Sequence, residues 1–168
     1  MVRSQRGHGR IHGRQRVSVA FRRDGDEEHL EPKFEVPIPP GPNLVTPEGM
    51  DLIHARIAGL EAQIPTLAEE TALNTAKRDL RYWKKRLSTA AVQPAPSGEK
   101  AMFGHRVRFA LNGKPREVRI VGHDEAEPAK GDLAFTAPLA RALLGAEAGE
   151  FVDFNGREEA IEILELIA

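Results

Sequence analysis

The sequence predicts an α+β protein in which an antiparallel helical hairpin precedes a β-rich domain with one short helix. Two mirrored apolar ladders, each stepping by 3, 4, 3, 4 and 3 residues, indicate the hairpin. An Asn112-Gly113 pair between alternating apolar segments indicates a β-hairpin in the domain that follows. A basic and then acidic beginning has little to bury, which predicts disorder before the hairpin.

The composition of the 168 residues limits the functions open to the chain. There are 24 Lys and Arg against 25 Asp and Glu, so local charge is more informative than the net charge of −1. The absence of cysteine excludes disulfides, thiolate metal sites and a cysteine nucleophile. Because no segment has the length of a membrane span or the pattern of a secretory signal, we expect a cytoplasmic monomer without cofactor or metal.

Residues 1–42 are predicted to form a disordered tail. The first 23 residues contain seven arginines and no acid, and the next eight contain five acids. Arginines that neutralise phosphates would give this tail a loose electrostatic grip on nucleic acid, and a merely solvated tail is the alternative. Four prolines between residues 37 and 42 keep the chain extended as far as the hairpin.

Residues 43–92 are predicted to form the hairpin, with the two ladders facing each other along a coiled-coil seam. If the chain turns back between Leu67 and Leu73, the residue numbers of every facing pair sum to 140. The ladders are Met50, Ile53, Ile57, Leu60, Ile64 and Leu67, and Leu73, Ala76, Leu80, Trp83, Leu87 and Ala90. Such a hairpin suggests a protein that reaches into another molecule.

The first helix has a clear start and one irregularity. Thr46 supplies a capping oxygen, and Pro47 takes the first helical position. Pro65 removes an internal hydrogen bond, so it bends the helix. Alternatively the helix ends at Ile64, and Thr66 caps a second piece.

The second helix is basic, whereas the tip of the hairpin is acidic. Glu69 and Glu70 lie at the tip. The positive charges of the helix favour an acidic partner surface or RNA, and an ordinary solvated face is the alternative. The basic residues are Lys77, Arg78, Arg81, Lys84, Lys85 and Arg86, against the single acid Asp79.

Residues 93–101 are predicted to be a linker, and residues 102–168 a β domain. Alternating apolar residues flank the Asn112-Gly113 turn, and a short helix is expected from Pro138 to Leu144. Further strands are expected over Phe151 to Phe154 and Ala160 to Ile167, although the last segment also fits a helical stripe. His105 and His123 have no evident partner and are expected at the surface.

Three segments of this domain resemble the C-terminal domain of the bacterial Gre transcript-cleavage factors. They are IVGHDEAEP over 120–128, GDLAFTAPLARALLG over 131–145 and GEFV over 149–152. The family pattern has a valine-glycine with an acidic turn, then a helix with arginine-alanine-leucine-leucine, then a glycine-acid strand. The Thr-Pro-Glu-Gly helix start at 46–49 also resembles the N-terminal half of the family. This resemblance favours a strand for the last segment.

The resemblance implies an FKBP-like β domain that docks on the rim of the RNA polymerase secondary channel, with the hairpin inserted into that channel. Asp132, Pro138 and Arg141 become candidate polymerase contacts, and a turn, a helix start and a solvated face are their alternative roles. In Gre factors two acids at the tip help to hold the second catalytic magnesium of the polymerase. Glu69 and Glu70 are the candidates here, and solvation of a loop is the alternative.

Two departures from the family bear on activity. The tip lacks the family's pattern, and the hairpin is shorter by several turns. Ala137 stands where the family has a capping serine, a loss on the order of 0.5–2 kcal/mol. We therefore expect an elongation regulator, not an enzyme, with weak or absent stimulation of cleavage. The alternatives are an active cleavage factor that uses both tip acids, a regulator of nucleoside diphosphate kinase, and an FKBP-like prolyl isomerase or chaperone.

Overall fold

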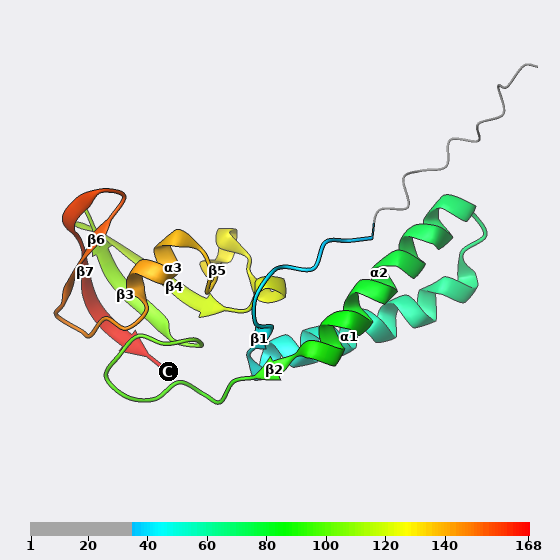
Figure 1. The fold of residues 1–168 in the computed structure, drawn as a ribbon, viewed down its shortest axis with the longest axis horizontal. Coiled ribbons are helices and arrows are strands. Elements are labelled where there is room, and N and C mark those ends of the chain that lie inside the picture. Colours follow the sequence, from blue (N-terminus) through cyan, green and yellow to red (C-terminus); the bar gives the residue numbers. More distant parts are fainter. Residues whose placement is uncertain (1–34) are drawn as a thin grey trace, which may run out of the picture. The chain divides into compact units, whose positions relative to one another are not determined.

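The computed structural model describes residues 35–168, so the predicted arginine-rich tail and its nucleic-acid contact lie outside the described residues. Helices and a β-sheet within this part of the chain confirm the predicted α+β class (Figure 1). Glu35 to Ala168 form one compact unit. No helix in this unit is long and apolar enough to cross a membrane.

Two long helices, α1 (Pro47–Gln63) and α2 (Glu70–Thr89), lie side by side and run in opposite directions (Figure 1). Every residue of the two apolar ladders is buried or half-buried. Only Ile53 and Ala76 among them are fully buried, at 0% and 5% exposure. Two helices cannot enclose a core by themselves, so most of the seam keeps one side open to water.

Of the two predictions made for Pro65, the bent helix is wrong, whereas a first helix that ends at Ile64 is confirmed to within one residue, with Ile64 as its C-cap. The first helix ends at Gln63, and Pro65 lies in a separate 3-10 turn, η1 (Ile64–Thr66). Thr66 does not cap the next helix, because its hydroxyl donates backward to the Gln63 carbonyl at 2.8 Å. Glu69 is the N-cap of α2 instead.

A short parallel ladder joins the two ends of the helix pair and was not predicted. Strand β1 (Leu44–Val45) precedes α1, and β2 (Ala91–Val92) follows α2. The Ala91 amide donates to the Asn43 carbonyl at 2.8 Å, and the Gln93 amide donates to the Val45 carbonyl at 2.9 Å. Strands of two residues carry no periodic pattern, so this pairing has no signal in the sequence.

The remaining strands form one five-stranded sheet in the order β5-β4-β3-β7-β6, with only β4 and β5 parallel. Asn112 and Gly113 have φ values of 50° and 75°, which gives the predicted tight turn between β3 and β4. The ambiguous last segment is a strand. The strands are β3 (Arg106–Leu111), β4 (Lys114–Val121), β5 (Asp132–Ala134), β6 (Phe151–Phe154) and β7 (Arg157–Ile167).

The short helix α3 (Pro138–Leu143) covers one face of this sheet and closes the core. Alternating residues of β3, β4 and β7 point into this core, which explains why every second position is apolar. Ala137 is the N-cap of α3 and makes no side-chain hydrogen bond, as the missing serine predicts. The largest residues of this core at 0% exposure are Phe109, Ile120, Leu143, Ile161 and Ile163.

His105 lies in this domain and is not the surface residue that the sequence suggests. Its exposure is 2%, and its Nδ1 atom accepts a hydrogen bond from the Met102 amide at 3.1 Å. Burial lowers the pKa of the His105 imidazole, because the charged form loses its solvation. A neutral histidine therefore fixes the loop before β3.

Candidate functional site

The two acids at the tip of the helix pair have different roles. The Glu69 carboxylate accepts from the Thr71 amide at 2.8 Å and from the Ala72 amide at 2.6 Å. These backbone donors, with Ala72 the stronger, hold the pKa of the Glu69 carboxyl below its usual value. Glu70 is exposed in the first turn of α2, and no hydrogen bond or ion pair within residues 35–168 engages its carboxylate.

This arrangement gives the tip one available carboxylate. Both oxygens of Glu69 are already used to satisfy amides that the helix leaves unpaired. No group of three or more His, Asp or Glu side chains in the described residues could hold a metal ion. Glu70 can therefore supply one ligand to a metal that another molecule holds.

The basic face of α2 is partly neutralised. Lys77 and Lys85 are exposed and have no ion pair within residues 35–168. Of the other four predicted residues, three have exposed partners: Arg78 with Asp79 at 3.4 Å, Arg81 with Glu35 at 2.6 Å, and Lys84 with Glu61 of α1 at 2.7 Å. These pairs are solvent-exposed, so an anionic partner could replace the carboxylates at little cost.

Arg86 does not belong to the exposed basic face on which the sequence places it. The residue is 1% exposed, and its Nε atom donates to the Asp124 carboxylate at 2.5 Å. The Tyr82 hydroxyl donates to the other oxygen of Asp124. Burial, together with this acid, raises the pKa of Tyr82 to about 12. A buried guanidinium needs such a partner, because an unpaired charge in the interior is costly.

Glu125, the next residue, contacts the start of α1. Its Oε2 atom accepts from the Thr46 amide and from the Gly122 amide, each at 3.1 Å, and its Oε1 atom accepts from the Thr46 hydroxyl. The Thr46 hydroxyl oxygen in turn accepts from the Gly49 amide at 3.0 Å, which is the predicted N-cap. A carboxylate next to these amides also interacts favourably with the helix dipole.

Asp124 and Glu125 both lie in a short 3-10 turn, η2 (His123–Glu125), between β4 and β5. The sequence marks them only as consecutive acids after a strand. Their partners in and before the two helices are 38 to 79 residues away along the chain, so no local pattern identifies these contacts.

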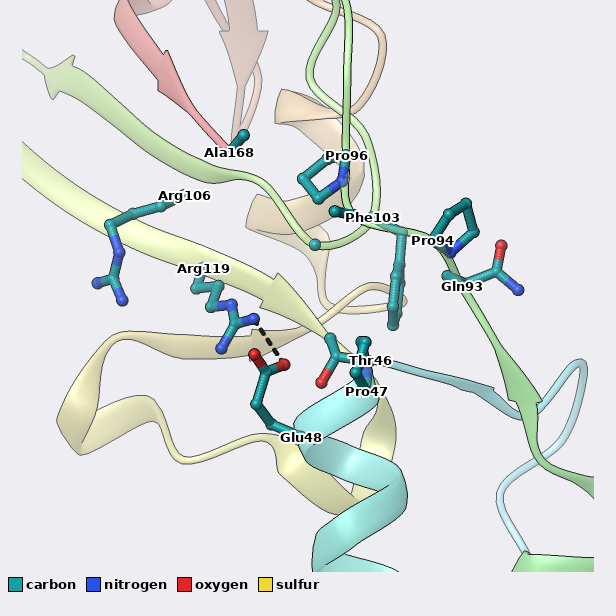
Figure 2. Close-up of a pocket in the computed structure, with 12 residues that line it drawn as sticks. Thr46, Pro47, Glu48, Gln93, Pro94, Pro96, Phe103, Arg106, Arg119 and Ala168 are labelled. Atoms are coloured by element: carbon teal, nitrogen blue, oxygen red, sulfur yellow. Dashed lines mark hydrogen bonds and ion pairs between the residues drawn. The ribbon is translucent and has the colours of Figure 1, made fainter.

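A pocket of about 260 Å³ lies beside the start of α1 (Figure 2). Its walls come from the beginning of α1, the 93–96 segment, Phe103 and two neighbouring strands. Arg106 and Arg119 face each other across β3 and β4, which would repel without acids nearby. Arg106 pairs with Glu117 at 3.1 Å. Arg119 pairs with Glu48 at 3.0 Å, as the dashed line in Figure 2 shows. Both arginines that line the pocket are therefore paired with acids.

The predicted polymerase contacts lie on the β domain and do not line this pocket. Asp132 is half-buried at the start of β5, and its backbone bonds to Glu127. Pro138 and Arg141 are exposed on α3, and Arg141 has no ion pair within the described part of the chain. Arg141 is thus available to an acidic partner.

Comparison with known proteins finds a family model and several relatives that are similar to parts of this chain. Residues 95–167 match the family model "Transcription elongation factor, GreA/GreB, C-term". A transcription elongation factor GreA of Nitratidesulfovibrio vulgaris (strain DP4) is 43% identical over 56 residues, which are 32% of this chain and 34% of that protein. A GreA of Sinorhizobium medicae (strain WSM419) is 39% identical over 72 residues, 40% of this chain and 46% of that protein.

The chain thus matches less than half the length of these two curated relatives. The crystal structure of GreA factor homolog 1 (Gfh1) of Thermus thermophilus covers 76% of this chain and 100% of its own, at 18% identity and a TM-score of 0.35. An overlap at that score does not establish a shared arrangement of the elements.

Proposed function

Because residues 95–167 match the family model of the GreA/GreB C-terminal domain, we propose that the chain is a Gre-type regulator of transcription elongation that binds RNA polymerase. The family match of this domain is the observation that carries the proposal. The α1/α2 pair before the domain supports it, because a long, half-open pair of helices suits insertion into a channel. Such a regulator acts in the cytoplasm and lends side chains to the polymerase rather than performing chemistry itself.

In this proposal the β domain docks on the rim of the secondary channel. Pro138 and Arg141 are exposed on α3, and Asp132 lies at the start of the neighbouring strand β5. Arg141 offers a charge that no acid of the described residues neutralises, so it is the strongest candidate of the three for an acidic surface of the polymerase.

The α1/α2 pair would then enter the channel with its tip first. Of the two tip acids, Glu70 is free to approach the second magnesium of the polymerase, whereas Glu69 holds the first turn of α2. One available carboxylate supports weak stimulation of transcript cleavage at most. Lys77 and Lys85 are cations of α2 without an ion pair within residues 35–168, so they are available to nucleic acid or an acidic wall of the channel.

The binding part of the proposal is tested by a pull-down of core RNA polymerase with the full chain. We expect retention by the wild type and a loss of retention on Arg141→Ala. Arg116→Ala is the matched control, since Arg116 is also an exposed arginine of the β domain. No retention of the polymerase by the wild-type chain contradicts the proposal.

The tip is tested by cleavage of a backtracked transcript in the presence of magnesium. Weak stimulation by the wild type should disappear on Glu70→Gln and persist on Glu69→Gln when helix content is unchanged. Binding without any cleavage indicates a regulator that occupies the channel only. Strong stimulation that requires both acids supports the alternative of an active cleavage factor.

A further inference from the structure

Two consecutive acids of the β domain hold two different helices. Asp124 reaches α2, where it binds the Arg86 guanidinium at 2.5 Å and the Tyr82 hydroxyl. Glu125 reaches the start of α1, where it binds the amide and the hydroxyl of Thr46. The Asp124 side chain is 7% exposed and that of Arg86 is 2% exposed, so this ion pair is desolvated rather than a surface pair.

The space around Glu125 leaves its carboxylate little freedom. A Cβ atom placed on Gly49 would lie 2.2 Å from the Glu125 Cδ atom, and one on Gly122 would lie 2.6 Å from its Oε2 atom. Both positions therefore require glycine for the carboxylate to bind as it does. Since the Glu125 oxygens already have three donors, any displacement breaks several hydrogen bonds together.

The Asp124 and Glu125 contacts together constrain the helix pair more than either would alone, and the exposed Arg119–Glu48 ion pair is a third, weaker contact between α1 and the sheet. A single contact at the base would leave the pair free to rotate about that contact. Asp124 holds α2, and Glu125 holds the start of α1. The β1/β2 ladder joins the start of α1 to the end of α2.

The length of the helices makes this constraint important at the tip. The 17 residues of α1 extend about 26 Å at 1.5 Å per residue, so a rotation of about 10° at the base moves the tip by about 4–5 Å. Misplacement of a reacting or coordinating group by about 1 Å already costs on the order of 100-fold in rate. The position of Glu70 therefore depends on how firmly the base is held.

We propose that Asp124 and Glu125 form a clamp that sets the direction of the α1/α2 pair relative to the sheet, which makes them positioning residues for the tip. The effect on the polymerase rests on the proposed function, whereas the clamp itself is a property of the free chain. It is therefore tested first without any partner.

The chain contains no cysteine, so two spin labels can be attached without other changes. We choose Gln63→Cys at the end of α1 and Arg116→Cys on β4, both exposed, and measure their distance distribution by double electron–electron resonance. A narrow distribution is expected for the otherwise unchanged chain. A broad one overturns the clamp.

The test variant is Asp124→Asn with Glu125→Gln, which removes both charges but keeps the side-chain shapes. We expect its distance distribution to broaden about twofold or more, as for a released hinge, while helix content by circular dichroism is retained. Asp51→Asn with Glu158→Gln is the matched control, because it removes the same charge from two exposed acids. A distribution as narrow in the test variant as in the control overturns the proposal.

Three further variants keep the test decisive if the double variant loses helix content. Gly49→Ala displaces Glu125 without a change of charge and should broaden the distribution. Thr46→Ser keeps the hydroxyl and should leave it narrow, whereas Thr46→Val should broaden it. Equal widths for the Ser and Val variants, together with a narrow Gly49→Ala distribution, contradict the clamp.

The effect of the clamp on the polymerase is measured in a separate experiment. With the double variant we expect retention of the polymerase by the β domain and at least a tenfold loss of any effect that requires the tip. If the wild-type chain does not bind polymerase, the proposed function fails while the distance measurement still decides the clamp. If the double variant binds and acts like the wild type, the positioning role is overturned.

Discussion

The two ends of the α1/α2 pair share one apolar pattern and differ in what stabilises them. At the base, Ile53 is completely buried, and Arg86 is paired with Asp124 of the β domain. At the tip, Ile64 is half-buried, and Glu69 binds only amides of its own helix. The seam therefore specifies where the helices meet, whereas tertiary contacts concentrate stability at the base.

This difference has a functional meaning under the proposed role. A base that is buried and charge-paired can hold the pair in one direction, while a tip stabilised by local hydrogen bonds leaves Glu70 free for a partner. Low local stability is common where a protein meets its ligand. The following predictions test the contrast between base and tip.

The largest effect is expected from Arg86→Ala at the base. It leaves the Asp124 carboxylate buried without its cation, which should lower the free energy of unfolding by about 3–5 kcal/mol. Lys85→Ala changes the exposed neighbour and should cost no more than about 0.5 kcal/mol. Urea denaturation of both variants checks the difference. Equal losses would mean that Arg86 is solvated like the rest of the basic face.

The same substitution at the two ends of the seam compares their packing directly. Ile53→Ala removes a fully buried side chain and should cost about 2–5 kcal/mol, whereas Ile64→Ala should cost less than half as much. Thermal and urea unfolding measure both. If Ile64→Ala costs as much as Ile53→Ala, the tip is as firmly packed as the base.

A smaller, local effect is expected from loss of the Glu69 cap. Glu69→Ala leaves the Thr71 and Ala72 amides unpaired, so their hydrogen exchange should accelerate while that of the base is unchanged. The lowered pKa of Glu69 means that its contribution to stability is present above the ordinary carboxyl pKa and is lost as the pH falls through the lowered value. Glu70→Ala is the control, because its carboxylate accepts neither amide. Exchange that accelerates equally in both variants contradicts the cap.

The smallest effect is spectroscopic and reports on the base alone. Tyr82 is the single tyrosine of the chain, so phenolate absorbance follows one group. Its pKa should be near 12 in the wild type, and Asp124→Asn should shift it toward 10 by removing the negative charge. Because the pKa of Tyr82 is raised in the folded protein, the protonated hydroxyl contributes to the free energy of unfolding. This contribution is present below about pH 10 and is lost as the pH rises toward 12. A wild-type midpoint at 10 contradicts the buried Tyr82–Asp124 contact.

Much of the local structure follows from residues close together in the chain. The threonine-proline start of α1, the Asn112-Gly113 turn and the uncapped start of α3 at Ala137 depend on chemistry within a few residues. The two apolar ladders correctly predict which faces of α1 and α2 are buried or half-buried. The last strand was ambiguous because its apolar spacing fits both periods, and pairing with β3 resolves it.

The sequence by itself determined the helices, the turn and the apolar faces, since each depends on short-range patterns. Only the tertiary structure decided that Arg86 is buried and that Asp124 and Glu125 hold the helices. The physical reason is distance along the chain. A charged residue shows no sign of its partner when that partner lies 38 residues away, because its burial is favourable only after folding brings the two together.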